Sequence, residues 1–422
     1  MLVKQKTKIA ILTIHPYNYG GVLKTVKAVY NFCKIYFEPK LFFLGFEPEI
    51  SAYLKGFKFN SETRYKNYLG MDSIEIGARW SFWEPGHYFF TKKAWERELK
   101  EYDYIFVVSG TSIAAHPAIL LNKKFVLWAG TSFVDDRFVR IAKIPLIRRF
   151  IDKVASFFMN KIEKKILINA DYIWTLSSHT KSYFEKIIGF KKENLEAVGY
   201  FLEDDFLLQN IDFDARDKCL IAVGRFSDPR KNITMLLNVF EKICSVLPEY
   251  KLFIVGLKPD KKDLQKFESK NFYKNVIFTG VVSNQELKDL YKKSTLKLIT
   301  SYQEGFGIAG LEAMAFGLPI VSADCGGPRD YVKDGENGFL VKVNDINDMA
   351  QKSLLILENS NLHKKMSEKS LEIIRTKFSK AFIYSKWKNG LVKVYPELKD
   401  LFIKNDLSIG IKEEKLDEHS CY

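Results

Sequence analysis

Short runs of β-branched and aromatic residues alternate with amphipathic stretches along most of this chain. In the first half, we expect buried strands at residues 8–14, 40–44, 104–109, 124–129 and 172–177. Amphipathic segments at residues 22–36 and 147–168 follow helical spacing between some of these runs. Strands that alternate with helices are typical of a parallel sheet covered by helices. The pattern therefore predicts an α/β architecture.

An acidic, poorly periodic segment at residues 203–217 interrupts this pattern, and a second series follows it. Its expected strands lie at residues 220–224, 252–256, 276–280, 296–300 and 319–323, each succeeded by a helix. We therefore expect two tandem Rossmann-like domains with a ligand cleft between them. The expected boundaries are residues 1–203 and 218–380 for the domains, 204–217 for a linker, 381–400 for a C-terminal helix and 401–422 for a polar tail.

The composition of the 422 residues argues against several classes of protein. Five scattered cysteines without a CxxC pair argue against a disulfide scaffold or a structural zinc site. No run of about 18 apolar residues occurs, and the apolar run at residues 9–14 is too short for a signal peptide. We therefore expect a cytoplasmic protein. Its formal net charge of +14 calls for an acidic partner, such as nucleic acid, anionic lipid or a phosphorylated small molecule.

A basic turn follows the first expected strand of the second series. Residues 224–232 read Gly-Arg-Phe-Ser-Asp-Pro-Arg-Lys-Asn and open a helix. Ligands bind at the carboxyl ends of strands in an open parallel sheet, which is where this turn must lie. Arg225 offers a planar fork for a diphosphate, and Lys231 adds a point charge. Taken alone, the segment is better explained as a solvated basic turn.

A second segment, residues 304–312, also follows an expected strand and opens a helix. The first amide groups of that helix would face an anion, and Gly305 and Gly307 would let the backbone approach a ligand. Glu304 and Glu312 are eight positions apart, which is about 12 Å along a helix. That spacing is too wide for an acid/base pair on one bond. It suits one carboxylate on a sugar hydroxyl and the other on a ribose diol.

Together these segments form a pattern of Gly-Arg-x5-Lys followed about eighty residues later by Glu-x7-Glu. The pattern resembles the retaining family-4 glycosyltransferases of the GT-B fold. Residues 19–22, 326–330 and 334–341 resemble further motifs of that family. The resemblance extends to about residue 395 and is densest from 218 to 345. It implies a GT-B fold, with the acceptor on the N-terminal domain, the donor on the C-terminal domain, and helix 381–400 packing back across the cleft.

The resemblance also implies a role for each matching residue. Arg225 and Lys231 would bind the donor diphosphate, Glu304 the donor sugar and Glu312 the ribose hydroxyls, with Arg225, Lys231 and Glu304 as the catalytic group. The remaining donor-binding positions would be Gly20, Gly21, Gly224, Val282, Phe306, Gly307 and Ile308. The co-substrate would be a nucleotide-diphosphate sugar, and no metal or other cofactor is expected because two cations and a helix terminus would already neutralise the leaving diphosphate.

One position departs from the family. Gly130 stands where many members have a histidine close to the sugar. This departure keeps a nucleotide-sugar-binding pseudoenzyme open as an alternative. A GT-B-like nucleotide-sugar epimerase is a second alternative, although it needs acid/base side chains around the sugar and the sequence supplies few histidines there. Nucleic-acid binding is a third alternative that the charge permits, although no RNA or DNA motif occurs. The Asp-Phe-Asp at 212–214 resembles a DxD metal motif, but in the expected linker a solvated turn is favoured.

The segment 137–165 carries nine Lys or Arg residues against two acids, so its net charge is 9 − 2 = +7. Apolar residues recur at helical spacing within it, at Ile147, Phe150, Ile151, Val154, Phe158, Ile162 and Ile166. We expect this apolar stripe to pack on the N-terminal sheet while the cations face anionic lipid headgroups. The predicted protein is therefore peripheral on the inner face of the cytoplasmic membrane, with a lipid-linked or surface glycan as acceptor and no nucleic-acid partner.

Overall fold

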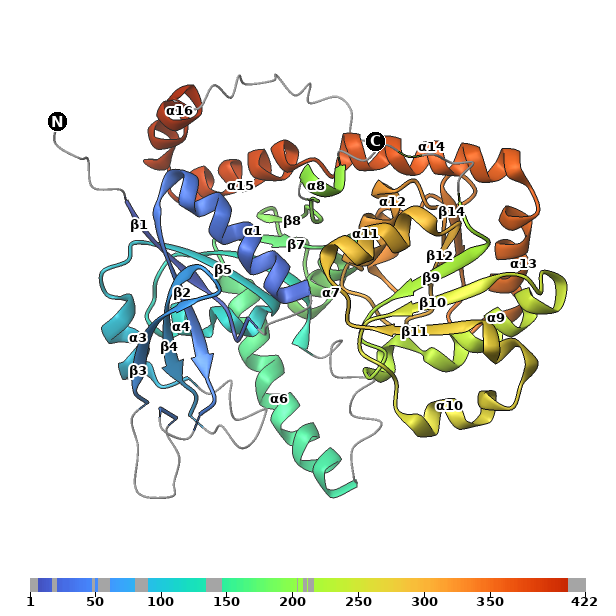
Figure 1. The fold of residues 1–422 in the computed structure, drawn as a ribbon. Coiled ribbons are helices and arrows are strands. Elements are labelled where there is room, and N and C mark those ends of the chain that lie inside the picture. The colour runs from blue at the N-terminus through green and yellow to red at the C-terminus, as the bar shows by residue number, and fades with distance from the viewer. Residues whose placement is uncertain are drawn as a thin grey trace. The chain divides into compact units, whose positions relative to one another are not determined.

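The computed structural model describes residues 7–16, 21–47, 50–51, 61–79, 90–133, 146–202, 204–207, 211 and 216–408, with only the backbone for 146–151 and 204–205. The chain divides into two compact units (Figure 1). Unit 1 comprises Met1–Ala129, Lys165–Ile173 and Tyr384–Tyr422, and unit 2 comprises Gly130–Lys164 and Trp174–Ile383. The domain boundaries expected from the sequence stay a prediction.

The first sheet has eight strands in the order β3-β4-β2-β1-β5-β6-β7-β8. In chain order they are β1 (Lys8–Leu12), β2 (Glu38–Gly45), β3 (Thr63–Tyr68), β4 (Met71–Gly77), β5 (Tyr104–Thr111), β6 (Val126–Thr131), β7 (Tyr172–Thr175) and β8 (Leu195–Ala197). Strand β1 pairs in parallel with β2 and β5, whereas β3 pairs antiparallel with β4. The five strands expected from the sequence are present, and β3, β4 and β8 are additional.

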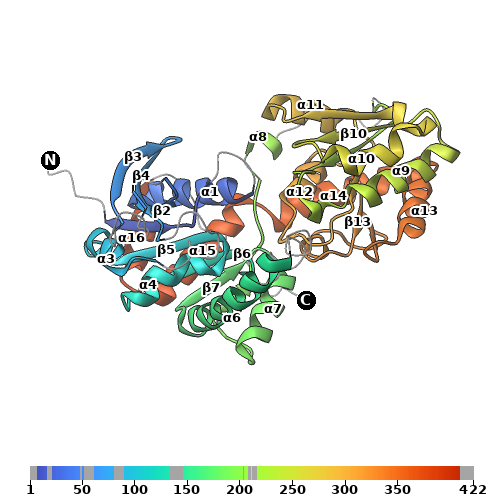
Figure 2. The same ribbon diagram turned by 90° about the horizontal axis from the view of Figure 1, so that it is seen from below.

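Aromatic side chains hold the helices of unit 1 together. Helix α1 (Gly21–Tyr36) and helix α15 (Lys380–Val394) are far apart in sequence but lie side by side in Figures 1 and 2. The ring of Phe32 on α1 lies 5.3 Å from that of Trp387 on α15, and Trp387 also contacts Trp128 on β6 at 4.8 Å. Phe402 of α16 (Leu398–Ser408) packs edge-on against Tyr36. Among the residues of unit 1 that the structure describes, further helices are α3 (Lys92–Leu99) and α4 (His116–Leu120).

The second sheet has six parallel strands in the order β11-β10-β9-β12-β13-β14. They are β9 (Cys219–Val223), β10 (Lys251–Val255), β11 (Val276–Gly280), β12 (Leu296–Ile299), β13 (Ile320–Ala323) and β14 (Gly338–Val341). Its helices are α9 (Ile233–Val246), α10 (Lys261–Glu268), α11 (Asn284–Lys293), α12 (Ile308–Ala315), α13 (Ile346–Leu357) and α14 (Ser360–Lys377). The expectation of two Rossmann-like α/β sheets is confirmed, and β14 is a strand that the sequence reading missed.

Helix α6 (Leu146–Asn169) corrects one expectation from the sequence. Of the predicted apolar stripe, Val154 and Phe158 are about half exposed, and only Ile166 is fully buried among the described members. The buried side of α6 instead carries Met159 and the acid Glu163, together with other small or apolar residues. The predicted stripe therefore extends from the exposed side of α6 to its buried side instead of forming the buried side.

Several expected features fall outside the described residues: Gly20, the Asp-Phe-Asp at 212–214 and the tail from residue 409 onward. In the expected linker, residues 204–207 form the single helical turn α8 (Asp204–Leu207). Within the described residues, no helix has both the length and the apolar character to cross a membrane. The four described cysteines are buried and free.

Candidate functional site

Strand order marks one edge of the second sheet as a ligand site. Strand β9 lies between β10 and β12. The next two strands in the chain, β10 and β11, lie on one side of β9, whereas β12, β13 and β14 lie on its other side. In open parallel sheets, ligands bind at such a switch point, outside the carboxyl ends of the strands. The turns that follow β9 and β12 are the two motifs singled out from the sequence, residues 224–232 and 304–312.

The turn after β9 presents Lys231 into this edge. Gly224 continues β9 by donating its amide to the Val255 carbonyl, and the side chain of Lys231 runs directly over Gly224, where an added Cβ would lie 3.1 Å from Lys231 Cε. Asp228 caps the following 3₁₀ turn and holds Arg230 in an ion pair of 2.7 Å. Arg225 is exposed. The turn therefore places one cation inward and one at the surface.

Lys231 and Glu304 form the centre of the site. Lys231 Nζ lies 2.5 Å from Glu304 Oε1, and the Ser301 hydroxyl donates to the same oxygen at 2.6 Å. Burial by itself would raise the pKa of Glu304, but the charge and hydrogen bond of Lys231, with Ser301 and Arg230, hold that pKa below its usual value. Glu304 is therefore an ionised acceptor that a sugar hydroxyl could bind.

The backbone after Glu304 is closely packed at two glycines, where a side chain would clash with other parts of unit 2. A Cβ on Gly305 would lie 2.8 Å from the Gly130 carbonyl oxygen, and one on Gly307 would lie 2.7 Å from the Tyr331 hydroxyl. Gly307 also has φ +82, a left-handed conformation that favours glycine, and it is the N-cap of α12. Ile308, the first residue of α12, follows this glycine directly, and a helix N-terminus favours an anion.

Glu312 lies just over one turn into α12 and is buried. The Tyr291 hydroxyl donates to its Oε2 at 3.1 Å, which fixes the carboxylate. The same region holds Lys297, a buried lysine on β12 that the sequence reading did not single out. Burial lowers the pKa of Lys297 to about 7, partly opposed by the charge of Glu312. A lysine within the apolar run Leu296–Ile299 is the sequence signal that could have found it.

The backbone of Gly130 also lies against this edge. Its carbonyl accepts a hydrogen bond of 2.9 Å from the Thr180 hydroxyl, besides its close approach to Gly305. The next residue, Thr131, accepts a hydrogen bond from Gln303 Nε2 at 3.2 Å. At the position where the resemblance to family-4 glycosyltransferases leads us to expect a histidine, the chain therefore presents backbone and neutral polar groups.

The structure brings most of the predicted residues of unit 2 to one place. Gly224, Lys231 and Glu304 are in mutual contact through Lys231, and Gly307, Ile308 and Glu312 belong to or begin the helix that follows Glu304. The Phe306 side chain is a core residue, because its ring packs on Tyr331 and Phe378. Val282 is half-buried in the turn before α11. Gly21 begins α1 in unit 1.

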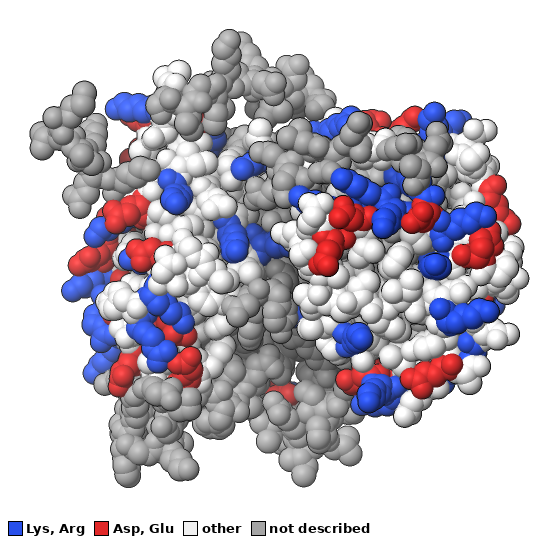
Figure 3. Space-filling model, in the orientation of Figure 1, with Lys and Arg blue, Asp and Glu red and all other residues white. Residues whose placement is uncertain are grey.

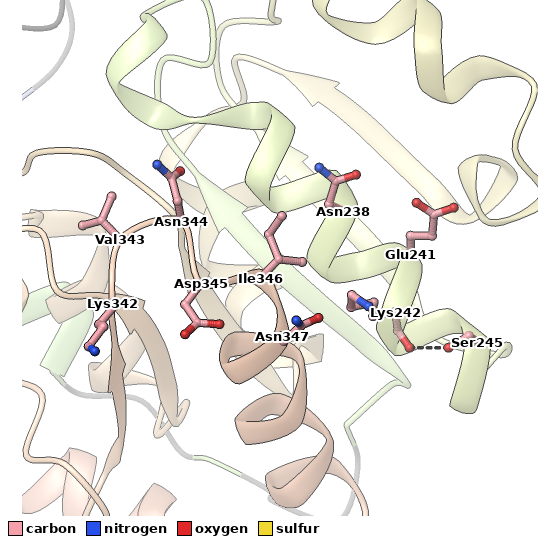
Figure 4. Close-up of a pocket in the computed structure, with 10 residues that line it drawn as sticks. All are labelled: Asn238, Glu241, Lys242, Ser245, Lys342, Val343, Asn344, Asp345, Ile346 and Asn347. Carbon is pink, nitrogen blue, oxygen red and sulfur yellow. Dashed lines mark hydrogen bonds between the residues drawn. The ribbon is translucent and has the colours of Figure 1, made fainter.

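A separate hollow of about 770 Å³ lies on the surface of unit 2 (Figure 4). It is lined from α9 by Asn238, Glu241, Lys242 and Ser245, from the segment between β14 and α13 by Lys342, Val343, Asn344 and Asp345, and from the start of α13 by Ile346 and Asn347. None of these residues belongs to the site predicted from the sequence. Among the described residues there is also no group of three or more His, Cys, Asp or Glu side chains placed to hold a metal ion.

Comparisons with known proteins agree on the class. The family model described as glycosyl transferases group 1 matches residues 204–372. A poly(ribitol-phosphate) alpha-N-acetylglucosaminyltransferase of Staphylococcus aureus is 30% identical over 233 residues, which are 54% of this chain and 46% of that protein. An uncharacterized glycosyltransferase of Methanocaldococcus jannaschii is 31% identical over 180 residues, 43% of this chain and 48% of that protein. The chain thus matches about half the length of these two relatives.

Solved structures show the same fold over nearly the whole chain. Sucrose-phosphate synthase from Thermosynechococcus elongatus superimposes with a TM-score of 0.69 and 18% identity, covering 94% of this chain and 100% of that one. The Anabaena protein HepE in complex with UDP superimposes with a TM-score of 0.68 and 15% identity, covering 91% and 99%. Residues 204–372 of this chain are therefore similar to the glycosyl transferases group 1 family, and the chain has the two-sheet architecture of GT-B proteins.

Proposed function

We propose that this chain transfers a sugar from a nucleotide-diphosphate sugar to a hydroxyl group of an acceptor, with retention of the anomeric configuration. The observation that carries the proposal is the Lys231–Glu304 pair at the switch point of the second sheet, beside the N-terminus of α12. A cation, an ionised carboxylate and a helix N-terminus at one strand edge suit a sugar joined to a diphosphate.

In this proposal the donor diphosphate binds to Arg225, Lys231 and the first amides of α12. Lys231 is already preorganised by Glu304, so it can stabilise the charge that develops on the leaving diphosphate without reorganising. Glu304 accepts hydroxyls of the donor sugar, and Glu312 accepts those of the ribose. Gly20, Gly21, Gly224, Val282, Phe306, Gly307 and Ile308 complete the donor site, as the family resemblance implies.

The resemblance also implies a front-face displacement without a protein nucleophile. The departing phosphate oxygen takes the proton of the acceptor hydroxyl, so no histidine at position 130 is required for proton transfer. Two cations and a helix N-terminus supply the positive charge at the diphosphate, and we therefore propose a reaction without a metal ion. A uridine donor is the first to test, because HepE was crystallised with UDP-glucose.

We propose a lipid-linked or surface glycan as the acceptor. The Staphylococcus aureus relative and a Bacillus subtilis poly(glycerol-phosphate) alpha-glucosyltransferase, 29% identical over 159 residues, are both named for polyol-phosphate polymers, so an acceptor that is itself a polymer is in keeping with these names. Such an acceptor goes with a cytoplasmic enzyme held at the inner face of the membrane.

The test begins with a thermal-shift panel of UDP, GDP and ADP sugars, because a ligand that binds the native state raises the melting temperature. The best donor is then incubated with candidate acceptors in chelator, and the anomeric proton of the product is observed by NMR. Release of nucleoside diphosphate with a retained anomer supports the proposal. An inverted anomer or loss of activity in chelator contradicts it. Donor epimers formed without acceptor indicate an epimerase, and binding without turnover of any donor indicates a pseudoenzyme.

A further inference from the structure

The exposed side of helix α6 combines cations with large apolar side chains. Within its described side chains, from residue 152 to 169, the exposed apolar residues are Val154 (47%), Phe157 (57%), Phe158 (50%) and Ile168 (43%). Four lysines are exposed among them: Lys153, Lys161, Lys164 and Lys165. We call these eight residues the α6 face.

The eight residues lie on one strip of the helix. At 3.6 residues per turn they fall on an arc of about 140°, in which lysines and apolar side chains are interspersed. The Lys161 ammonium lies over the Phe157 ring, 4.4 Å from its centre, so charge and aromatic surface are in direct contact. The strip is therefore amphipathic residue by residue instead of being divided into an apolar and a polar half.

The acids of this stretch do not neutralise the lysines. Asp152 and Glu163 are both fully buried on the opposite side of α6, and the Glu163 carboxylate accepts the Phe133 amide at 3.0 Å and 3.3 Å. Within residues 152–169 the α6 face thus carries four positive charges and no acid, 4 − 0 = +4. On the face of the molecule shown in Figure 3, by contrast, basic and acidic side chains are interspersed.

Exposed apolar residues elsewhere are more dispersed. Of the thirteen large apolar side chains that are exposed in the described part of the chain, four lie on this one helix. Exposed aromatic residues in water carry a free-energy cost unless another surface covers them. Lysine stems can lie along such a surface while their ammonium groups reach outward to anions.

We propose that the α6 face binds an anionic phospholipid bilayer, with Phe157, Phe158 and Val154 inserted at the level of the headgroups and acyl chains. The lysines between them then bind lipid phosphates. This occupant fits both properties of the strip, since anionic lipid attracts cations and its interfacial region accepts aromatic rings. The proposal rests on the proposed function only for its purpose, which is to bring the enzyme to a membrane-borne acceptor.

The experiment measures co-sedimentation of the full chain with vesicles, without donor or acceptor. Vesicles of phosphatidylcholine alone are compared with vesicles containing about 40% phosphatidylglycerol, at about 0.1 M and about 0.5 M NaCl. We expect binding to the anionic vesicles that weakens at the higher salt. Two variants follow: Phe157→Ser with Phe158→Ser, and a fourfold Lys→Gln change at 153, 161, 164 and 165. Each should lower the vesicle affinity at least about tenfold.

Matched controls alter the same chemistry elsewhere. Phe190→Ser changes a phenylalanine that is 51% exposed, and a fourfold Lys→Gln change at the exposed residues 258, 261, 262 and 274 removes the same charge. Both controls should bind vesicles like the wild type. The proposal is overturned if the control variants lose as much vesicle affinity as the α6 variants, or if the wild type does not bind anionic vesicles. It is also overturned if the free chain sediments as a dimer and the Phe157→Ser, Phe158→Ser variant abolishes that dimer. Sugar transfer to a short soluble acceptor should remain unchanged in all variants, which separates this result from a failure of the proposed function.

Discussion

Lys231 and Arg225 are both expected to bind the donor diphosphate, but the structure predicts different consequences when each loses its charge. Lys231→Met keeps most of the side chain that covers Gly224 while it leaves Glu304 without its ion-pair partner. Arg225→Met removes the same charge from an exposed residue. We therefore expect the two variants to lose similar activity, whereas only Lys231→Met should lower the free energy of unfolding substantially.

The expected magnitudes follow from burial. Removing one partner of a buried ion pair destabilises a protein by about 3–5 kcal/mol, because the other charge is left uncompensated. The side chains of Lys231 and Glu304 are 20% and 14% exposed, so solvent screening reduces the expected loss to about 2–3 kcal/mol. For Arg225→Met the expected change in unfolding free energy is within about 0.5 kcal/mol. Both variants should lose about 2 kcal/mol or more of transition-state stabilisation, which is about thirtyfold in kcat/KM.

The loss of stability should depend on pH. In the wild type the pKa of Glu304 is below its usual 4.5, so Glu304 contributes stability above that pH and loses it as the pH falls. Without Lys231, burial dominates and raises the pKa of Glu304 above its usual value. The ionised carboxylate then destabilises the variant at neutral pH, and the penalty is relieved as the pH falls. Urea unfolding at about pH 5 and about pH 7.5 should therefore show a larger difference from wild type at the higher pH.

The double variant Lys231→Met, Glu304→Gln tests whether the lost stability comes from the unpaired carboxylate of Glu304. It removes both charges, so it should recover most of the lost unfolding free energy while staying inactive. The reasoning is refuted if Lys231→Met unfolds like the wild type, if Arg225→Met is equally destabilised, or if the double variant is no more stable than Lys231→Met.

Two further substitutions test the surroundings of this pair. Burial lowers the pKa of Lys297 to about 7, whereas its ordinary pKa is 10.5. Between these pH values the unfolded chain holds a proton on Lys297 that the folded chain has released. The unfolding free energy should therefore rise with pH in this range. Lys297→Met should remove that slope and stabilise the protein by up to about 4–5 kcal/mol at pH 7, and by progressively less toward pH 10; equal stability of wild type and variant by urea unfolding at pH 7 would contradict the assignment. Gly305→Ala places a Cβ 2.8 Å from the backbone carbonyl oxygen of Gly130, so a backbone shift costing about 1–3 kcal/mol is expected, with a weaker UDP-induced rise in melting temperature. Thr180→Ala removes the other contact of that carbonyl and serves as the comparison, because it takes away a hydrogen bond without adding an atom at the site.

The strands that carry the site could be predicted from the sequence, because parallel strands buried on both faces have a continuous apolar pattern. The turns at 224–232 and 304–312 were located by the same logic, since each follows such a strand. The hairpin β3–β4 was missed because Thr63–Tyr68 is largely polar and lies at the edge of the sheet. Lys297 was missed because a single cation within an apolar strand is indistinguishable in sequence from one at a strand edge, and only the pairing of β12 with β9 and β13 shows that it is central.

The error on α6 has a different physical origin. Periodicity reports which residues share a face of a helix, but it does not report what that face meets. Here the buried side contains Asp152 and Glu163, which a hydrophobicity scale counts as evidence for exposure. Glu163 is buried because its carboxylate is satisfied by the Phe133 amide, a partner thirty residues away that no local pattern reveals.

The composition of the site around Gly130 explains why Lys231 should dominate its electrostatics. Near the Gly130 carbonyl the described contacts come from Thr180, from the Thr131–Gln303 hydrogen bond and from the backbone at Gly305, all of them neutral. A histidine at position 130 would have added a group able to carry positive charge there. In its absence, the positive charge directed at Glu304 comes from the turn after β9, chiefly from Lys231. Substituting histidine for Gly130 should therefore make the enzyme less dependent on Lys231: the loss of kcat/KM caused by Lys231→Met should be smaller in a Gly130→His background, and an equal loss in both backgrounds would show that position 130 does not share the charge of the donor site.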